Sequence, residues 1–260
     1  MTLSPATAHP ATAHPAAGRP AIGRTLLRLH RPALLVWTAF VVVGAGGLLW
    51  IHCSAAPRDR SCVPGGWCVY TAFTDTGNVM NLLDRALSYA PCAVAAWAGA
   101  ALIGRELESG TAALAWTQGA TPVRWLTAKL ATAALPLLAG TAVLALVYNT
   151  VWSADQDVLV THWAWDRVFV PRGPLLPALT LCALATGALA GLALRRTLPA
   201  LAAACAATLA VRLYLRELWL PLRGPLHGFW PLHLAATGMA LALTALATTA
   251  AYAVLRRRSA

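Results

Sequence analysis

The most informative polar segment of the sequence runs from residue 105 to residue 129, between two long apolar runs. Residues 111–118 predict a short amphipathic helix whose bulky side chains are Leu114 and Trp116. Thr121 followed by Pro122 predicts the start of another helix, because a threonine oxygen caps the first N–H groups and proline is tolerated at the first helical position. The chemistry of such a segment is binding: a short helix with a tryptophan suits a groove on another protein.

A second interpretation of the same segment is an anchor at the membrane surface. The side chains of Arg124, Trp125 and Lys129 are spaced as in a helix that lies among lipid headgroups. From the residues alone, the anchor and the partner-docking helix remain equally open.

Catalytic motifs are absent from the sequence. A phosphate-binding loop of the form G-x-x-x-x-G-K-[ST] cannot form, since the only lysine, Lys129, follows Leu126-Thr127-Ala128. Neither H-E-x-x-H nor G-x-S-x-G occurs. Asp155, Asp157 and His162 come nearest to a metal site, but polar loops collect such residues by chance. We therefore expect no enzyme, no metal and no directly bound cofactor.

The composition indicates a membrane protein. Hydrophobic residues make up 58% of the 260 residues and charged residues 11%, against about 25% charged residues in soluble domains. A soluble fold with so few charges would expose large apolar patches. The net charge of +11 is spread in short groups between apolar runs, which is typical of topology signals and not of a nucleic-acid-binding face.

Six apolar runs are long enough, or nearly long enough, to span a bilayer as helices. They cover about residues 33–52, 86–104, 130–152, 174–194, 198–215 and 233–255. The predicted fold class is therefore all-α, a polytopic membrane domain over residues 25–258. Residues 1–24, which repeat an Ala-Thr-Ala-His-Pro unit, predict a disordered tail.

The fifth span is short unless it continues past Arg212. That arginine would then snorkel to the headgroups; alternatively, the segment is re-entrant. None of the other five runs contains a charged residue, so we expect no proton or sodium relay inside the membrane. If the chain transports, its energy comes from a partner. Gly187 and Gly191 form a G-x-x-x-G pair, a weak signal that also fits internal packing.

The distribution of basic residues predicts that both termini are cytoplasmic. More Lys and Arg residues fall on the side of the N-terminus than on the other side, with clusters at 195–196 and 256–258. On this map Cys62 and Cys68 lie in the first outer loop, around the turn-rich stretch 63–67. In an oxidising compartment a disulfide between them is favoured over free thiols.

The polar segment also carries a family resemblance. The run R-E-L-E-x-G-T-x-x-L-A-W-T-Q, followed by T-x-x-R-W-L-x-x-K-L, spans Arg105 to Leu130. It resembles the signature of permease subunits of type-2 ABC transporters, in a subgroup common in high-GC bacteria. A second run, R-R-T-L-P-A at residues 195–200, enters the fifth span and is also similar. The likeness covers about residues 24–258 and leaves out the N-terminal repeat.

The resemblance implies a function for the polar segment. In such permeases the loop after the second span carries a coupling helix that docks on a separate ABC ATPase subunit. The residues that would transmit its motion are Glu106, Glu108, Gly110, Thr111, Trp116, Thr117 and Gln118, with Arg124, Trp125 and Lys129 as membrane-interface anchor. The family also has a short re-entrant hairpin before the last span, which matches residues 213–231.

The whole assembly implied by the resemblance is a permease homodimer or heterodimer with two ATPase subunits, which bind ATP and Mg²⁺. It would export a hydrophobic or amphipathic substrate (a drug, peptide or lipid-like molecule) across the bacterial cytoplasmic membrane. A competing hypothesis is a non-transporting membrane sensor or assembly protein with the same topology, which would function without an ATPase. An intramembrane enzyme is the least favoured, since paired catalytic residues are missing.

Overall fold

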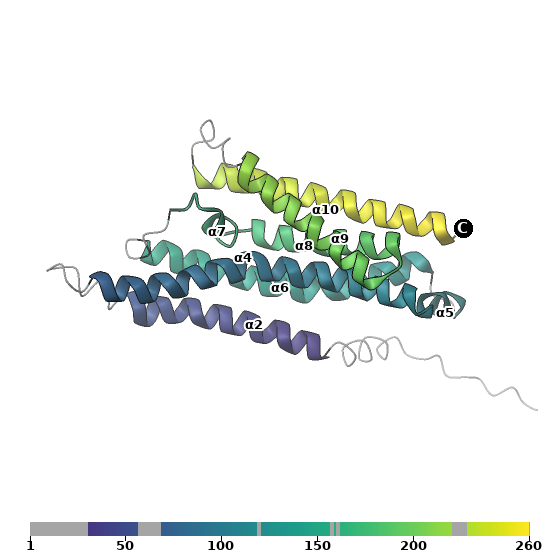
Figure 1. Cartoon of the computed structure of the whole chain (residues 1–260), viewed down its shortest axis with the longest axis horizontal. Helices are drawn as coiled ribbons and strands as arrows, with labels where there is room; N and C mark the ends of the chain where they lie inside the picture. Colours follow the sequence, from purple (N-terminus) through teal and green to yellow (C-terminus); the bar gives the residue numbers. More distant parts are fainter. Residues whose placement is uncertain are drawn as a thin grey trace, which may run out of the picture. The chain divides into compact units, whose positions relative to one another are not determined.

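The computed structural model describes residues 31–56, 69–118, 121–156, 159, 162–219 and 228–259. All regular structure in these ranges is helical, which confirms the all-α prediction (Figure 1). In chain order the elements are α2 (Arg31–Trp50), η1 (Ile51–Ala55), α4 (Val69–Glu108), α5 (Thr111–Thr117), α6 (Pro122–Asp155), α7 (Asp166–Phe169), α8 (Leu175–Leu194), α9 (Thr197–Tyr214), η2 (Leu215–Trp219) and α10 (Phe229–Ser259), where η marks a π-helical segment. The predicted tail 1–24, Cys62 and Cys68 lie outside the described residues.

Six of the described helices are long and apolar enough to cross a membrane, as the sequence predicts. They cover Ala33–Ser54, Gly77–Glu108, Pro122–Asp155, Leu175–Leu194, Thr197–Glu217 and Phe229–Arg258. Several are longer than the apolar runs that predicted them. At 1.5 Å per residue, the 34 residues of α6 extend for about 50 Å, beyond the roughly 30 Å hydrocarbon core. The polar ends of α4, α6 and α10 therefore have room to build sites outside the lipid.

Helix α8 is the centre of the packing. It contacts α4, α10, α9 and α6, and it is apolar on every side, as expected for a helix surrounded by others. Glycines bring α4 and α8 into backbone contact. A Cβ added to Gly187 would lie 2.5 Å from the carbonyl oxygen of Ala96, and one added to Gly99 would lie 2.4 Å from that of Leu184. Gly187 and Gly191 thus pack against α4 within the chain.

The fifth spanning helix corrects one expectation. Arg212 does not reach out to headgroups: its side chain is only 4% exposed and donates to the Asp166 carboxylate at 3.0 Å. A buried guanidinium needs a counter-charge, and Asp166 at the start of α7 supplies it. Of the stretch 213–231, residues 215–219 continue α9 as η2 and residues 229–231 begin α10. Residues 220–227 lie outside the described ranges.

A buried carboxylate lies just before the second apolar run. Helix α4 begins well before residue 86, so the second spanning helix includes Asp84, whose side chain is fully buried. Its Oδ1 accepts a hydrogen bond of 2.7 Å from the Tyr148 hydroxyl, and its Oδ2 lies 4.0 Å from Nε of Arg167. The apolar run could not reveal this carboxylate because the run starts after it.

The predicted polar loop residues around 155–162 have separate partners. The Asp155 carboxylate is buried and pairs with Nδ1 of His52 at 2.8 Å. Nδ1 of His162 accepts from the backbone N–H of Ala164 at 3.2 Å. Asp157 lies outside the described residues. The described part of the chain holds no group of three His, Cys, Asp or Glu side chains arranged for a metal ion.

Candidate partner-docking site

The polar segment 105–129 forms an elbow between α4 and α6, and we call residues 105–118 and 121–129 the elbow. Helix α4 ends at Glu108, and Gly110 takes a left-handed conformation with φ of 75°, which glycine adopts without a Cβ clash. The hydroxyls of Ser109 and Thr111 both donate to the backbone carbonyl of Glu106, at 3.4 and 3.3 Å. This carbonyl at the end of α4 is therefore satisfied by the turn, and α5 starts in a defined direction.

The predicted helix start at Thr121 is confirmed. The Thr121 hydroxyl accepts from the backbone N–H of Arg124 at 3.3 Å, and Pro122 occupies the first turn of α6. The Thr121 carbonyl accepts from the N–H of Trp125 at 3.0 Å. This capping sets where α6 begins and hence where Trp125 and Lys129 point.

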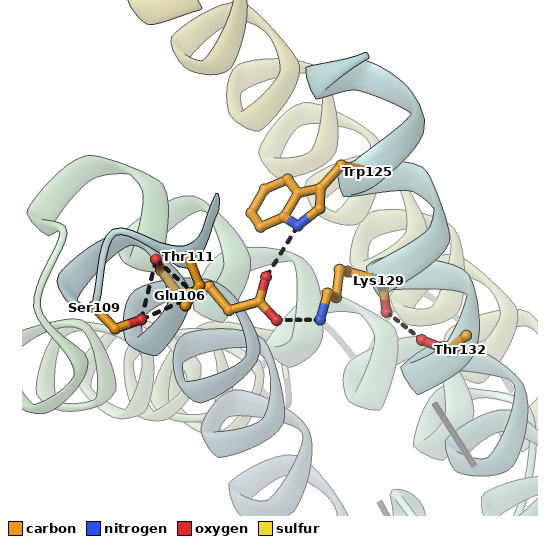
Figure 2. Close-up of polar contacts among 6 residues, drawn as sticks. All are labelled: Glu106, Ser109, Thr111, Trp125, Lys129 and Thr132. Atoms are coloured by element: carbon orange, nitrogen blue, oxygen red, sulfur yellow. Dashed lines mark hydrogen bonds and ion pairs between the residues drawn. The ribbon is translucent and has the colours of Figure 1, made fainter. Parts of the chain in front are cut away.

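The Glu106 carboxylate joins the two long helices of the elbow. Its Oε2 accepts a hydrogen bond of 3.0 Å from Nε1 of Trp125, and its Oε1 forms an ion pair with the Lys129 ammonium (Figure 2). The Lys129 side chain is 12% exposed and that of Glu106 29%, so the pair is shielded from solvent. One carboxylate of α4 thus holds two side chains of α6, one turn apart.

A second carboxylate joins α4 to α9. Oε2 of Glu108 accepts from the backbone N–H of Thr197 at 3.1 Å and from its hydroxyl at 2.9 Å. Arg196, at the cap position of α9, makes no side-chain cap of its own. Glu108 therefore caps α9 from another helix, and a negative charge is favourable at a helix N-terminus.

Helix α5 has an inner and an outer face. Ala112 is buried, and the Trp116 ring packs edge-on against Trp125 with centroids 5.9 Å apart. Both rings join an apolar cluster that includes Leu192 of α8 and Leu255 of α10. The outer face is formed by Thr111, Ala113, Leu114, Thr117 and Gln118, and Leu114 is 59% exposed. The bulky side chain offered to a partner is thus Leu114, while Trp116 is turned into the fold.

The residues predicted as anchors also separate into two groups. Arg124 is exposed, whereas Trp125 is buried and Lys129 points to Glu106. Within the elbow, Trp125 and Lys129 therefore hold helices together. The predicted coupling residues divide in the same way: Glu106, Glu108 and Trp116 connect helices, and Thr111, Thr117 and Gln118 lie at the surface.

Two contacts of α10, one of them with the elbow, could not be predicted from the sequence. The Arg258 guanidinium donates to the carbonyls of Leu192 and Ala193 at the end of α8. The hydroxyls of Thr127 and Tyr252 lie 2.7 Å apart, which joins α6 to α10. In the sequence, Arg258 appears only as one of three basic residues near the terminus. Figure 1 shows the end of α10 on the same side as α5.

Comparison with protein families identifies one match. A family model described as "ABC-2 membrane transporter related" matches residues 32–219, which is more than half of the chain. The match includes the whole elbow, α8 and α9. No curated protein and no solved structure matches the chain.

Proposed function

Because the chain belongs to the ABC-2 membrane transporter related family, we propose that it is the permease subunit of an exporter driven by a separate ABC ATPase. A transporter membrane subunit of this family has an ATPase as its partner. The elbow supports the finer proposal that α5 is the helix on which this ATPase docks.

The observation that carries the proposal is the bracing behind α5. Glu106 holds α6 through Trp125 and Lys129, and Glu108 holds the start of α9. A force on the outer face of α5 is therefore passed to three spanning helices together. The outer face itself is small and mostly uncharged, with Leu114 as its apolar contact. An exposed leucine beside polar hydroxyl and amide groups suits an apolar groove with a polar rim.

The orientation follows from the same proposal. ATP is in the cytoplasm, so the elbow faces the cytoplasm, as do the N- and C-termini, in a bacterial cytoplasmic membrane. The basic clusters at 195–196 and 256–258 support this orientation. ATP and Mg²⁺ bind the partner subunit, and two permease chains, alike or different, complete the transporter.

The proposed cargo is hydrophobic or amphipathic. Exposed apolar side chains follow the spanning helices, among them Leu135 and Leu146 of α6 and Leu209 of α9. Such faces contact lipid, and an apolar molecule dissolved in the bilayer can reach them laterally. Export of a drug, peptide or lipid-like molecule is therefore the transport reaction we propose.

The docking proposal is tested with Leu114→Ser. Loss of a leucine that becomes largely buried in a partner groove costs about 1–2 kcal/mol, or about tenfold in affinity. The protein is purified with a P-loop ATPase from its host, and binding and ATP hydrolysis by the reconstituted complex are measured. We expect weaker binding and lower permease-dependent hydrolysis for Leu114→Ser. Leu82→Ser is the matched control, because Leu82 is 68% exposed on α4, far along that helix from the elbow.

Two results would reject the proposal. The first is purification of a functional protein that binds no P-loop ATPase with or without nucleotide, which would favour the sensor or assembly protein. The second is labelling of Thr117→Cys, in a chain whose own six cysteines are replaced by serine, from outside intact cells by a membrane-impermeant maleimide, which would place the elbow on the wrong side of the membrane.

A further inference from the structure

At the end of the fold opposite the elbow, α4, α7 and η2 line a basic cavity that is open to the surface and has aromatic walls. Its volume is about 750 Å³, and its lining includes Arg85 and Tyr89 of α4, Trp165, Asp166 and Arg167 at α7, and Arg216 of η2. Figure 1 shows α7 and α5 at opposite ends of the helices. The cavity therefore lies far from the proposed ATPase contact and has no part in it.

The charge of this cavity is positive. Three guanidinium groups line it, from Arg85, Arg167 and Arg216, together with one carboxylate, from Asp166. That carboxylate already pairs with a fourth arginine, Arg212, at 3.0 Å. Outside the lining, Glu217 pairs with Arg216 at 3.1 Å, but both side chains are more than half exposed, so solvent screens this pair. A third carboxylate, that of the buried Asp84, lies 4.0 Å from Nε of Arg167, outside the lining. With Arg212, four arginines thus face three carboxylates, and an anion that enters the cavity finds a net positive charge.

The arginine behind the cavity is incompletely satisfied. Arg212 covers the Tyr89 ring, with its Cζ 4.6 Å from the centroid, and holds Asp166. Its Nε and Nη1 are buried and have no hydrogen-bond partner among the described residues. Buried arginine N–H groups are normally paired, and an unpaired one is costly. Arg212 itself does not line the cavity, so a bound anion would act on it through Asp166, which lines the cavity and pairs with Arg212.

Apolar surface continues from the cavity along the same helices. On α4, Tyr89 lies one turn from Arg85 toward the elbow and is 45% exposed. Leu209 and Leu213 are exposed on α9 next to the turns that carry Arg212 and Arg216. A ligand that occupies both the basic cavity and this apolar surface has a compact anionic head and an apolar tail.

We propose that this cavity binds the headgroup of an anionic amphiphile, with phosphate or carboxylate oxygens at Arg85, Arg167 and Arg216 and the tail along Leu213 and Leu209. The aromatic rings of Tyr89 and Trp165 form the walls at the level where the head meets the tail. The proposal does not depend on ATPase docking, so either can fail without the other.

The test measures binding of short-chain lipids to the whole detergent-solubilised protein by isothermal titration calorimetry. The probes are dihexanoyl-phosphatidylglycerol, dihexanoyl-phosphatidylcholine and inorganic phosphate. We expect the anionic lipid to bind at least about tenfold more tightly than either of the other two, and to bind more weakly as salt is raised. Equal binding of both lipids would overturn the proposal, and so would equal binding of phosphate and the anionic lipid.

Variants locate the site. The double variant Arg85→Gln and Arg216→Gln removes two exposed charges of the cavity and should weaken anionic-lipid binding about tenfold or more. The Lys pair at the same positions should retain most of the binding, since it keeps the charge. Arg257→Gln, exposed near the end of α10, measures the effect of losing one positive charge elsewhere. Unchanged binding in a folded Gln double variant would overturn the assignment, as would salt-independent binding by the unmodified chain.

Discussion

Replacing Glu106 by glutamine tests the central contact of the elbow. The amide oxygen of glutamine can still accept the N–H of Trp125, but the ion pair with Lys129 is lost. Since Lys129 is only 12% exposed, its ammonium is left shielded from water without a counter-charge. Breaking a fully buried pair costs about 3–5 kcal/mol, and an exposed pair about 0–1 kcal/mol. For this intermediate site we expect about 2 kcal/mol.

The assay is a double-mutant cycle with Lys129→Met. Thermal unfolding of the purified protein in detergent, with the four cysteines other than Cys92 and Cys182 replaced by serine, is followed with a thiol-reactive dye, which reports these two buried thiols as they become accessible. A loss of about 2 kcal/mol lowers the Tm by about 4–8 °C for a chain of this size. Adding Lys129→Met to Glu106→Gln should recover part of the loss, because the uncompensated ammonium is then gone.

The result that would refute this reasoning is additivity. If the two single variants together account for the double variant to within about 0.3–0.5 kcal/mol, the carboxylate and the ammonium do not interact in the folded protein. The bracing argument for α5 would then depend on the hydrogen bond from Trp125 to Glu106, on Glu108 and on the packing of Trp116. If Glu106→Gln leaves the Tm unchanged but abolishes stimulation of the ATPase, then Glu106 transmits motion without contributing to the stability of the fold.

Two further predictions concern the spanning helices. Gly99→Ala should lower the Tm by several degrees, because its Cβ would lie 2.4 Å from a carbonyl oxygen of α8. Gly238→Ala is the control and should be neutral or stabilising, because a Cβ there meets no atom within 4 Å. Equal Tm shifts for the two variants would contradict the close contact between α4 and α8. Tyr148→Phe should lower the free energy of unfolding, measured with denaturant, by about 1–3 kcal/mol, because the buried Asp84 carboxylate loses its hydroxyl donor. An unchanged unfolding midpoint would mean that this hydrogen bond contributes nothing to stability.

The features that the sequence predicted correctly depend on local signals. Apolar runs of about 20 residues identify spanning helices one at a time, because each helix satisfies its own backbone in lipid. The start of α6 was visible because Thr121 and Pro122 are adjacent and act on the next few residues. Likewise, the elbow was found from a contiguous run of residues. None of these predictions needed knowledge of which helices are neighbours.

The features that the sequence did not reveal depend on distant contacts. Glu108 and Thr197 are separated by 89 positions, and nothing in either segment says that one caps the other. Trp116 looked like a docking side chain, because whether its ring faces a partner or the fold depends on where Trp125 lies. Asp84 and Arg212 were missed as buried groups since their partners, Tyr148 and Asp166, belong to other helices.

The glycine contact between α4 and α8 has a consequence for the transport cycle. Where two backbones touch, no side chains lie between them that could change rotamer and let one helix slide along the other. These two helices therefore form one stiff unit that translates or tilts as a whole. In the proposed transport cycle, rearrangement would then fall on other helices, such as α6 and α9, most of whose residues are not buried inside this chain.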